Sequence, residues 1–300
     1  MTSSTFRFLD PEILRSLPNI EIVARFLVEG LYASRHRSPF YGYSVEFKDY
    51  REYAPGDAPK LIDWKAYART ERHFVKRFEM ESNMNVVCLL DISGSMDYQP
   101  IDPRRLKKLE YGNYLAASLC HLIIKQQDAA GLITFKDDIV DFLPPRQGQR
   151  HLLSLLSRLE DLQAESVTDL SNVLKKVAQR LRRRGIFVLI SDCHGDVEQT
   201  IDGIRHLIVQ GHEVVLFHLL DHDEIEFPYE DLSNFRDIET DQEVMLDPIR
   251  QRQDYLNRLN QFCTEIRNGS TGSGADYRLV NTSDPIEVVL RDYLIFRRQR

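Results

Sequence analysis

Two short, almost wholly apolar runs constrain the fold of this chain more than any other feature. They are NVVCLLD at Asn85–Asp91 and IFVLIS at Ile186–Ser191. Runs of this length and composition are typical of strands buried on both faces, which occur where helices cover both sides of a parallel sheet. The two runs therefore predict the central strands of an α/β sheet.

Amphipathic segments lie around these runs, so that strands and helices alternate from about residue 84 onward. In the segment 105–126, apolar residues recur at helical spacing and fall on one face. The alternation predicts an open, mostly parallel sheet with helices on both faces. The other expected elements are strands 130–135, 213–219 and 276–280, an edge hairpin around 139–143, and helices 148–161, 169–184, 197–209, 249–266 and 284–297.

The first part of the chain has a different pattern. Short helices are expected within residues 11–29. Extended stretches are expected after them, with a Pro-Gly-Asp turn between the first two. We interpret residues 1–82 as a small β-containing module, followed by an α/β domain at residues 83–300, with Trp64 as a buried anchor between them. The three extended stretches are 45–53, 61–67 and 73–80.

Composition places the chain among ordinary globular proteins. Of its 300 residues, 42% are hydrophobic and 28% are charged, which is enough apolar material for a sizeable core. No run approaches the about 18 apolar residues of a membrane helix, and the start has no secretory pattern. The cysteines lie far apart without a CxxC pair, which disfavours a zinc ribbon or a disulfide framework and leads us to expect a cytoplasmic protein. They are Cys88, Cys120, Cys193 and Cys263.

The net charge of −7 is concentrated in one segment. Residues 221–247 hold eleven acidic side chains and one basic one, so the rest of the chain is slightly positive. This distribution argues against nucleic acid as a partner, because no dominant basic face is expected. The acidic segment fits two readings equally: a solvated loop, or a segment that packs or docks through Phe227, Tyr229 and Phe235.

Hydroxyl and carboxylate groups are concentrated in three loops at strand ends or helix starts, where ligands bind in a sheet of this kind. Asp91, Ser93 and Ser95 follow the first apolar run, and Asp192 follows the second. The loop just before the expected helix 169–184 completes the set. It offers Ser166, Thr168 and Asp169.

Oxygen-only ligand sets suit hard cations such as Mg²⁺ or Mn²⁺. Ser93 and Ser95 alternate along their loop, so both hydroxyls can converge on one ion while Ile92 faces the core. Asp91 and Asp192 could receive the ion or hold its waters. Because few charges would touch the ion, it would stay electrophilic and recruit a carboxylate from outside. This pattern predicts binding rather than catalysis.

These residues resemble the metal-ion-dependent adhesion site of von Willebrand factor A domains. That family's pattern is DxSxS, then a threonine in a second loop, then an aspartate in a third, and DISGSM supplies the first part here. The resemblance implies a Rossmann-like α/β fold with one divalent ion. Ser166 and Asp169 remain alternatives to Thr168. The metal set that the resemblance implies is Asp91, Ser93, Ser95, Thr168 and Asp192.

A longer stretch, EFKDYREYAPGDAPKLIDWKAYART at residues 46–70, resembles a bacterial family of MoxR-associated proteins, labelled domain of unknown function fifty-eight. The resemblance runs from about Gly30 to the C-terminus and includes FPYEDLSNFRDIET. It implies a non-secreted adaptor or co-chaperone whose partner is a MoxR-type AAA+ ATPase or a client of that ATPase. No enzymatic activity is established at the level of that family.

Enzyme motifs are absent from the sequence. It contains no GxxxxGK[ST], GxGxxG or GxSxG pattern. The remaining enzymatic alternative is a metal-dependent phosphate-transferring hydrolase with Asp91 as the nucleophile, although Ser93 stands where such an enzyme would carry a second aspartate. We interpret His194 as a surface residue, and Cys193 as packed rather than reactive.

Overall fold

The computed structural model describes residue 24 and residues 44–53, 63–70, 72–81, 84–164, 170–181, 183–230, 233–236 and 243–298. The chain divides into two compact units, one at Phe40–Met84 and a larger one that includes Asn85–Arg300. Of the helices expected within 11–29, only Ala24 is described, and it is helical and buried.

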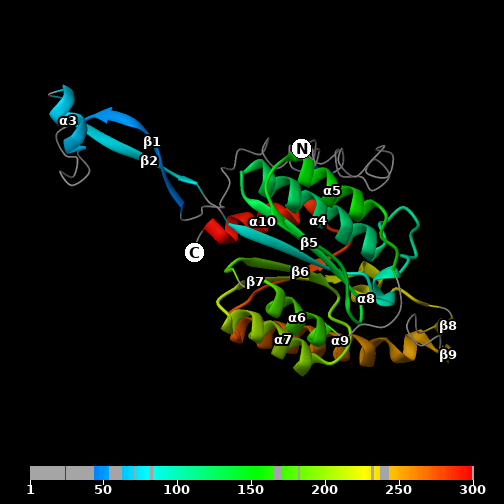
Figure 1. Cartoon of the computed structure of the whole chain (residues 1–300). Coiled ribbons are helices and arrows are strands. Elements are labelled where there is room, and N and C mark those ends of the chain that lie inside the picture. Colours follow the sequence, from blue (N-terminus) through cyan, green and yellow to red (C-terminus); the bar gives the residue numbers. More distant parts are fainter. Residues whose placement is uncertain are drawn as a thin grey trace, which may run out of the picture. The chain divides into compact units, whose positions relative to one another are not determined.

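The small unit is built on a two-stranded antiparallel sheet of β1 (Ser44–Glu52) and β2 (Phe74–Glu81), with a bulge between Phe47 and Asp49 (Figure 1). These strands confirm the first and third expected extended stretches. The second expectation, an extended stretch at 61–67, is wrong from Trp64 onward, because α3 (Trp64–Thr70) is a helix.

Local chemistry explains helix α3. The buried Asp63 precedes it, and its Oδ1 accepts a hydrogen bond from the backbone N–H of Ala66 at 3.2 Å. That bond satisfies a donor of the first turn, as an N-cap does. Lysine, alanine and arginine then favour the helix more strongly than its aromatic residues favour a strand.

Trp64 is 59% exposed, so the small unit itself does not bury it, and its expected role as an anchor between the two units stays a prediction. Its ring contacts Tyr67 and His73 edge-on, with centroids 6.1 and 6.3 Å away. Tyr67 in turn stacks on His73 at 4.4 Å. Trp64 is the first residue of the two-turn helix α3 in the unit of 45 residues.

The large unit contains a six-stranded sheet in the order β10-β7-β6-β3-β4-β5. All neighbouring pairs are parallel except β4 and β5, so β5 is an antiparallel edge strand as expected. The predicted open, mostly parallel sheet is confirmed. The strands are β3 (Asn85–Asp91), β4 (Ala129–Phe135), β5 (Ile139–Arg146), β6 (Ile186–Ser191), β7 (Glu213–Leu220) and β10 (Asp276–Asn281).

Helices cover both faces of this sheet (Figure 1). One layer contains α4 (Lys108–Lys125), α5 (Gln149–Glu160) and α10 (Ile286–Arg298). The other contains α6 (Leu170–Arg180), α7 (Val197–Val209) and α9 (Pro248–Gly272). Helix α6 ends four residues earlier than expected and α9 continues six residues further. The short elements are the 3-10 helix η2 (Gly94–Asp97), α8 (His222–Glu226), and the hairpin of β8 (Ser233–Arg236) with β9 (Glu243–Leu246).

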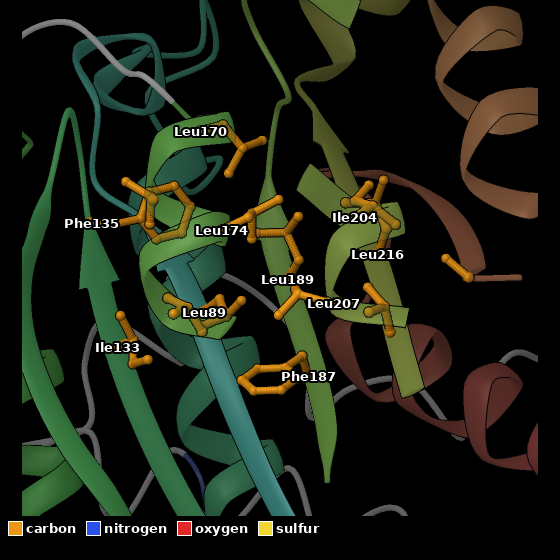
Figure 2. Packing of buried hydrophobic residues seen from close by; sticks show 14 of the residues in the cluster. Leu89, Ile133, Phe135, Leu170, Leu174, Phe187, Leu189, Ile204, Leu207 and Leu216 are labelled. Carbon is orange, nitrogen blue, oxygen red and sulfur yellow. The ribbon is translucent and has the colours of Figure 1, made fainter. Parts of the chain in front are cut away.

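The core on the α6 and α7 face holds the central strands in place. Leu89, Phe187, Leu189 and Leu216 from the sheet pack against helix side chains such as Leu174, and each is at most 1% exposed (Figure 2). Fully burying one such side chain contributes about 1.5–3 kcal/mol. This packing makes the strand ends a rigid platform for the loops that follow them.

The register of the two central strands places their polar ends together. Leu90 of β3 lies opposite Ile190 of β6 in the parallel pair. Asp91 and Ser191 therefore end neighbouring strands at the same edge of the sheet.

No helix in the described ranges is both long and apolar enough to cross a membrane.

Candidate metal centre

Asp91 forms the middle of the candidate site. It is 1% exposed, and its Oδ1 accepts a hydrogen bond from the backbone N–H of Ser93 at 2.9 Å. Its Oδ2 accepts one from the hydroxyl of Ser191 at 2.6 Å, and the Ser191 oxygen accepts from the N–H of Cys193 at 2.8 Å. Asp91 thus ties together the two loops that follow β3 and β6.

The two hydroxyls of the DxSxS segment lie side by side. Oγ of Ser93 is 3.0 Å from Oγ of Ser95. Ser93 is fully buried and Ser95 partly so, and Ile92 between Asp91 and Ser93 faces the core at 2% exposure. The structure therefore brings both serines to one point, as their alternation predicts.

Asp192 lies at the same edge and has a charged partner that the sequence analysis missed. Its Oδ2 accepts a hydrogen bond from Nζ of Lys108 at 2.8 Å, and its Oδ1 accepts one from the N–H of His194 at 3.2 Å. The same ammonium donates to Oε1 of Glu224 at 3.1 Å. Lys108 is 2% exposed, so a complete positive charge is buried beside the candidate site.

The two aspartates have opposite electrostatic environments. Burial, and then the nearby charge of Asp192, raise the pKa of Asp91 to about 7, although hydrogen bonds from Ser191 and Ser93 oppose the rise. Burial also acts to raise the pKa of Asp192, but the Lys108 ammonium outweighs it and holds this pKa below its ordinary value. Burial disfavours the charged form of Lys108, yet Asp192 and Glu224 raise its pKa above the ordinary value.

The residues present fit a hard divalent cation. Every donor is an oxygen, and no lysine or arginine in the described ranges forms an ion pair with Asp91. An added cation would compensate this buried carboxylate. No group of three or more His, Cys, Asp or Glu side chains among the described residues could hold a metal, so an ion here would need the serine hydroxyls as ligands. Thr168 and its alternatives Ser166 and Asp169 lie outside the described residues.

Sequence patterns contain a weak signal for the residues that were missed. Lys107 and Lys108 come at the start of α4, where the helix dipole disfavours positive charge. Two lysines there indicate that at least one has a specific acidic partner. Ser191 ends an otherwise apolar strand, and a hydroxyl at that position needs a polar neighbour such as Asp91.

The acidic segment packs against the domain over its first part. Asp221 and Asp223 are at most 2% exposed, and Arg105 forms ion pairs with both. The ring of Phe227 is 6% exposed and lies 4.4 Å from that of Tyr255. Of the two readings, packing is therefore correct for residues 221–227, whereas the side chain of Phe235 is not described.

The residues beside Asp192 are placed as expected. His194 is exposed at the surface, and Cys193 is fully buried. Burial raises the pKa of the Cys193 thiol well above its ordinary value. Neither residue has the setting of a catalytic base or nucleophile.

The fold resembles that of solved structures, and one of them is similar over most of its length. An aerotolerance-related membrane protein from Bacteroides fragilis superimposes with a TM-score of 0.50 at 20% identity, over 72% of this chain and 98% of that one. The VWA domain of SpRpn10 gives a TM-score of 0.41 at 12% identity, over 69% of this chain and 93% of that one. The large unit therefore shares an α/β fold, with helices on both faces of a mostly parallel sheet, with the Bacteroides fragilis protein.

Comparison of sequences identifies the family. An uncharacterised protein of Mycobacterium tuberculosis is 25% identical over 224 residues, which are 73% of this chain and 68% of that protein. The family described as "Protein of unknown function DUF58" matches residues 49–261, more than half of the chain. The chain therefore belongs to the DUF58 family.

Proposed function

We propose that this protein is a non-enzymatic adaptor that binds a partner protein through a divalent metal ion. The observation that carries the proposal is the buried Asp91 carboxylate, which joins two strand-end loops and lies beside the paired hydroxyls of Ser93 and Ser95. Asp91, Ser93, Ser95 and Thr168 would hold Mg²⁺ or Mn²⁺ directly or through water, and Asp192 would complete the shell. The ion would supply one open coordination position for an acidic side chain of the partner.

The proposed partner is a MoxR-type AAA+ ATPase or a client of that ATPase, and the proposed role is chaperone-like assembly or maturation of client proteins in the cytoplasm. This part of the proposal rests on the family resemblance of residues 46–70. Support for binding rather than catalysis comes from Ser93, because it stands where a phosphate-transferring hydrolase would carry a second aspartate.

The experiment measures metal binding and partner binding on the same variants. Mn²⁺ affinity is measured by electron paramagnetic resonance, and binding to a purified MoxR-type ATPase by surface plasmon resonance in Mg²⁺ or EDTA. We expect Ser93→Ala/Ser95→Ala to weaken Mn²⁺ binding by at least about tenfold and to abolish the Mg²⁺-dependent part of partner binding. The matched control is Ser154→Ala/Ser157→Ala, which removes two exposed hydroxyls from α5.

Two results would contradict the proposal. One is equal partner binding by the wild-type protein and the Ser93→Ala/Ser95→Ala variant. The other is release of phosphate from an aryl phosphate that Asp91→Ala abolishes, which would favour the hydrolase. Circular dichroism of each variant establishes that it is folded.

A further inference from the structure

The ammonium of Lys108 is the unusual charge in this part of the molecule. It is buried between the carboxylates of Asp192 and Glu224, at 2.8 and 3.1 Å, and it lies 5.9 Å from the ring centroid of Tyr98. A buried ammonium is costly unless acidic groups compensate it. The two carboxylates therefore hold this charge in place.

The position of Lys108 in its helix adds to that cost. It is the first residue of α4, where the helix dipole is positive. A positive side chain and a positive helix end thus coincide beside the strand-end loops. Helix propensity does not explain a buried lysine at this position. The role of Lys108 therefore lies in its interactions with the groups that it contacts.

Those groups belong to the candidate metal centre. The site holds two buried carboxylates, Asp91 and Asp192, together with the neutral hydroxyls of Ser93 and Ser95. The Lys108 ammonium cancels the charge of one of the two carboxylates. A divalent cation at this centre would be attracted by both aspartates but repelled by the ammonium, which lies 2.8 Å from Oδ2 of Asp192.

We propose that Lys108 sets the affinity of this centre, keeping divalent-ion binding weak until a partner supplies another carboxylate. The inference rests on the proposed function, because it requires an ion at Asp91, Ser93 and Ser95. It makes ion binding and partner binding interdependent: each is strong only when the other is present. Lys108 acts through Asp192 and is a positioning residue rather than a ligand.

The test compares Mn²⁺ dissociation constants, measured by electron paramagnetic resonance in the absence of any partner. Lys108→Met removes the charge and keeps the apolar stem. Lys108→Gln removes the charge and keeps a polar side chain with a hydrogen-bond donor. We expect both variants to bind Mn²⁺ at least about tenfold more tightly than the wild-type protein, because a charge at short range in a partly desolvated site is weakly screened.

The matched control is Lys125→Met, which removes the same charge from the exposed last turn of α4. That turn is about 25 Å along the helix from Lys108, so screening should leave Mn²⁺ affinity within about twofold of wild type.

Tighter Mn²⁺ binding by the Lys108 variants is a result that a purely structural role for Lys108 would not produce. If Lys108→Met does not fold, Lys108→Gln carries the comparison. Thermal unfolding with and without Mn²⁺ then gives a second measure of affinity.

The outcomes separate this inference from the function on which it rests. Mn²⁺ binding that Ser93→Ala/Ser95→Ala removes, but that the Lys108 variants do not strengthen, overturns the inference and leaves the proposed function standing. No Mn²⁺ binding by the wild-type protein or by any variant overturns both. Binding by the Lys108 variants alone supports the inference.

Discussion

Nζ of Lys108 lies 2.8 Å from Oδ2 of Asp192, although 84 residues separate the two in the chain. The ion pair joins the first turn of α4 to the loop that follows β6, and the second partner, Glu224, extends it to α8. The start of α4, the loop after β6 and helix α8 are therefore connected through a single buried charge. This connection makes the edge sensitive to substitutions that a surface ion pair would tolerate.

Removing Lys108 should destabilise the metal-free protein strongly. In EDTA we expect Lys108→Ala to lower the free energy of unfolding by about 3–5 kcal/mol, because it leaves the carboxylates of Asp192 and Glu224 without a counter-charge. Urea unfolding measures the loss. The control Lys107→Ala breaks only the exposed ion pair with Asp97 and should cost about 1 kcal/mol or less. Equal losses of unfolding free energy in the two variants would contradict this prediction, because burial of the Lys108 ion pairs would then add nothing to their contribution to stability.

Asp221 should matter more than an ordinary helix cap. It caps α8, and its carboxylate also accepts hydrogen bonds from Arg105 at 3.0 Å and Thr282 at 2.6 Å. We expect Asp221→Ala to cost about 3–5 kcal/mol of unfolding free energy, since it leaves a largely buried arginine with one fewer partner.

The matched control for Asp221 is the exposed cap of α7, Asp196, whose carboxylate accepts from the N–H of Gln199 at 3.0 Å. Asp196→Ala removes a cap but no buried ion pair, so we expect a loss of about 1 kcal/mol. Chemical denaturation of both variants under one set of conditions gives the comparison. A loss for Asp221→Ala no larger than that for Asp196→Ala would refute the importance of the pair with Arg105.

His218 should make the protein less stable in mild acid. Burial lowers the pKa of its imidazole from 6.5 to about 4. Its Nε2 lies 2.9 Å from the carbonyl oxygen of Asp192, which only accepts, so this nitrogen carries the proton. Nδ1 then accepts from the hydroxyl of Tyr277, also at 2.9 Å. The neutral imidazole of His218 therefore makes both hydrogen bonds.

The sign of the pH dependence follows from this lowered pKa. Since the unfolded chain takes up a proton at pH 6.5 and the folded one only near pH 4, the contribution of His218 is complete above pH 6.5. It is lost as the pH falls toward 4, by up to about 3 kcal/mol. Urea unfolding at several pH values between 4 and 7 should give a steeper loss for wild type than for His218→Asn. Parallel curves would be the contrary result.

The exposure of Trp64 can be tested directly, because the chain has one tryptophan. We expect its fluorescence to be quenched by iodide almost as strongly in the native protein as in urea, since 59% of the residue is exposed. Stern–Volmer plots in the two conditions provide the measurement. Strong protection in the native protein would support the reading of Trp64 as a buried anchor.

Local sequence patterns were sufficient to predict the central sheet and part of the candidate metal centre. The apolar runs at β3 and β6 predict buried strands because few other structures enclose such short segments completely. The alternation of Asp91, Ser93 and Ser95 places three polar groups at one strand end, and the structure brings the two serine hydroxyls to 3.0 Å. Patterns were weaker in the small unit, where the cap provided by Asp63 decides that residues 64–70 form a helix.

Residues close in the chain were therefore enough to predict the strands of the main sheet, the helices that cover it and the polar loops at the strand ends. Only the tertiary structure shows which polar and charged groups surround the aspartates of the site. The bond between Ser191 and Asp91 spans 100 residues, and the pair of Lys108 with Glu224 spans 116. Such partners are chosen by the register of neighbouring strands and by the packing of α4 and α8, which no local periodicity encodes. For the same reason, Lys108, which the sequence places only within a helical segment, is the buried cation of this edge.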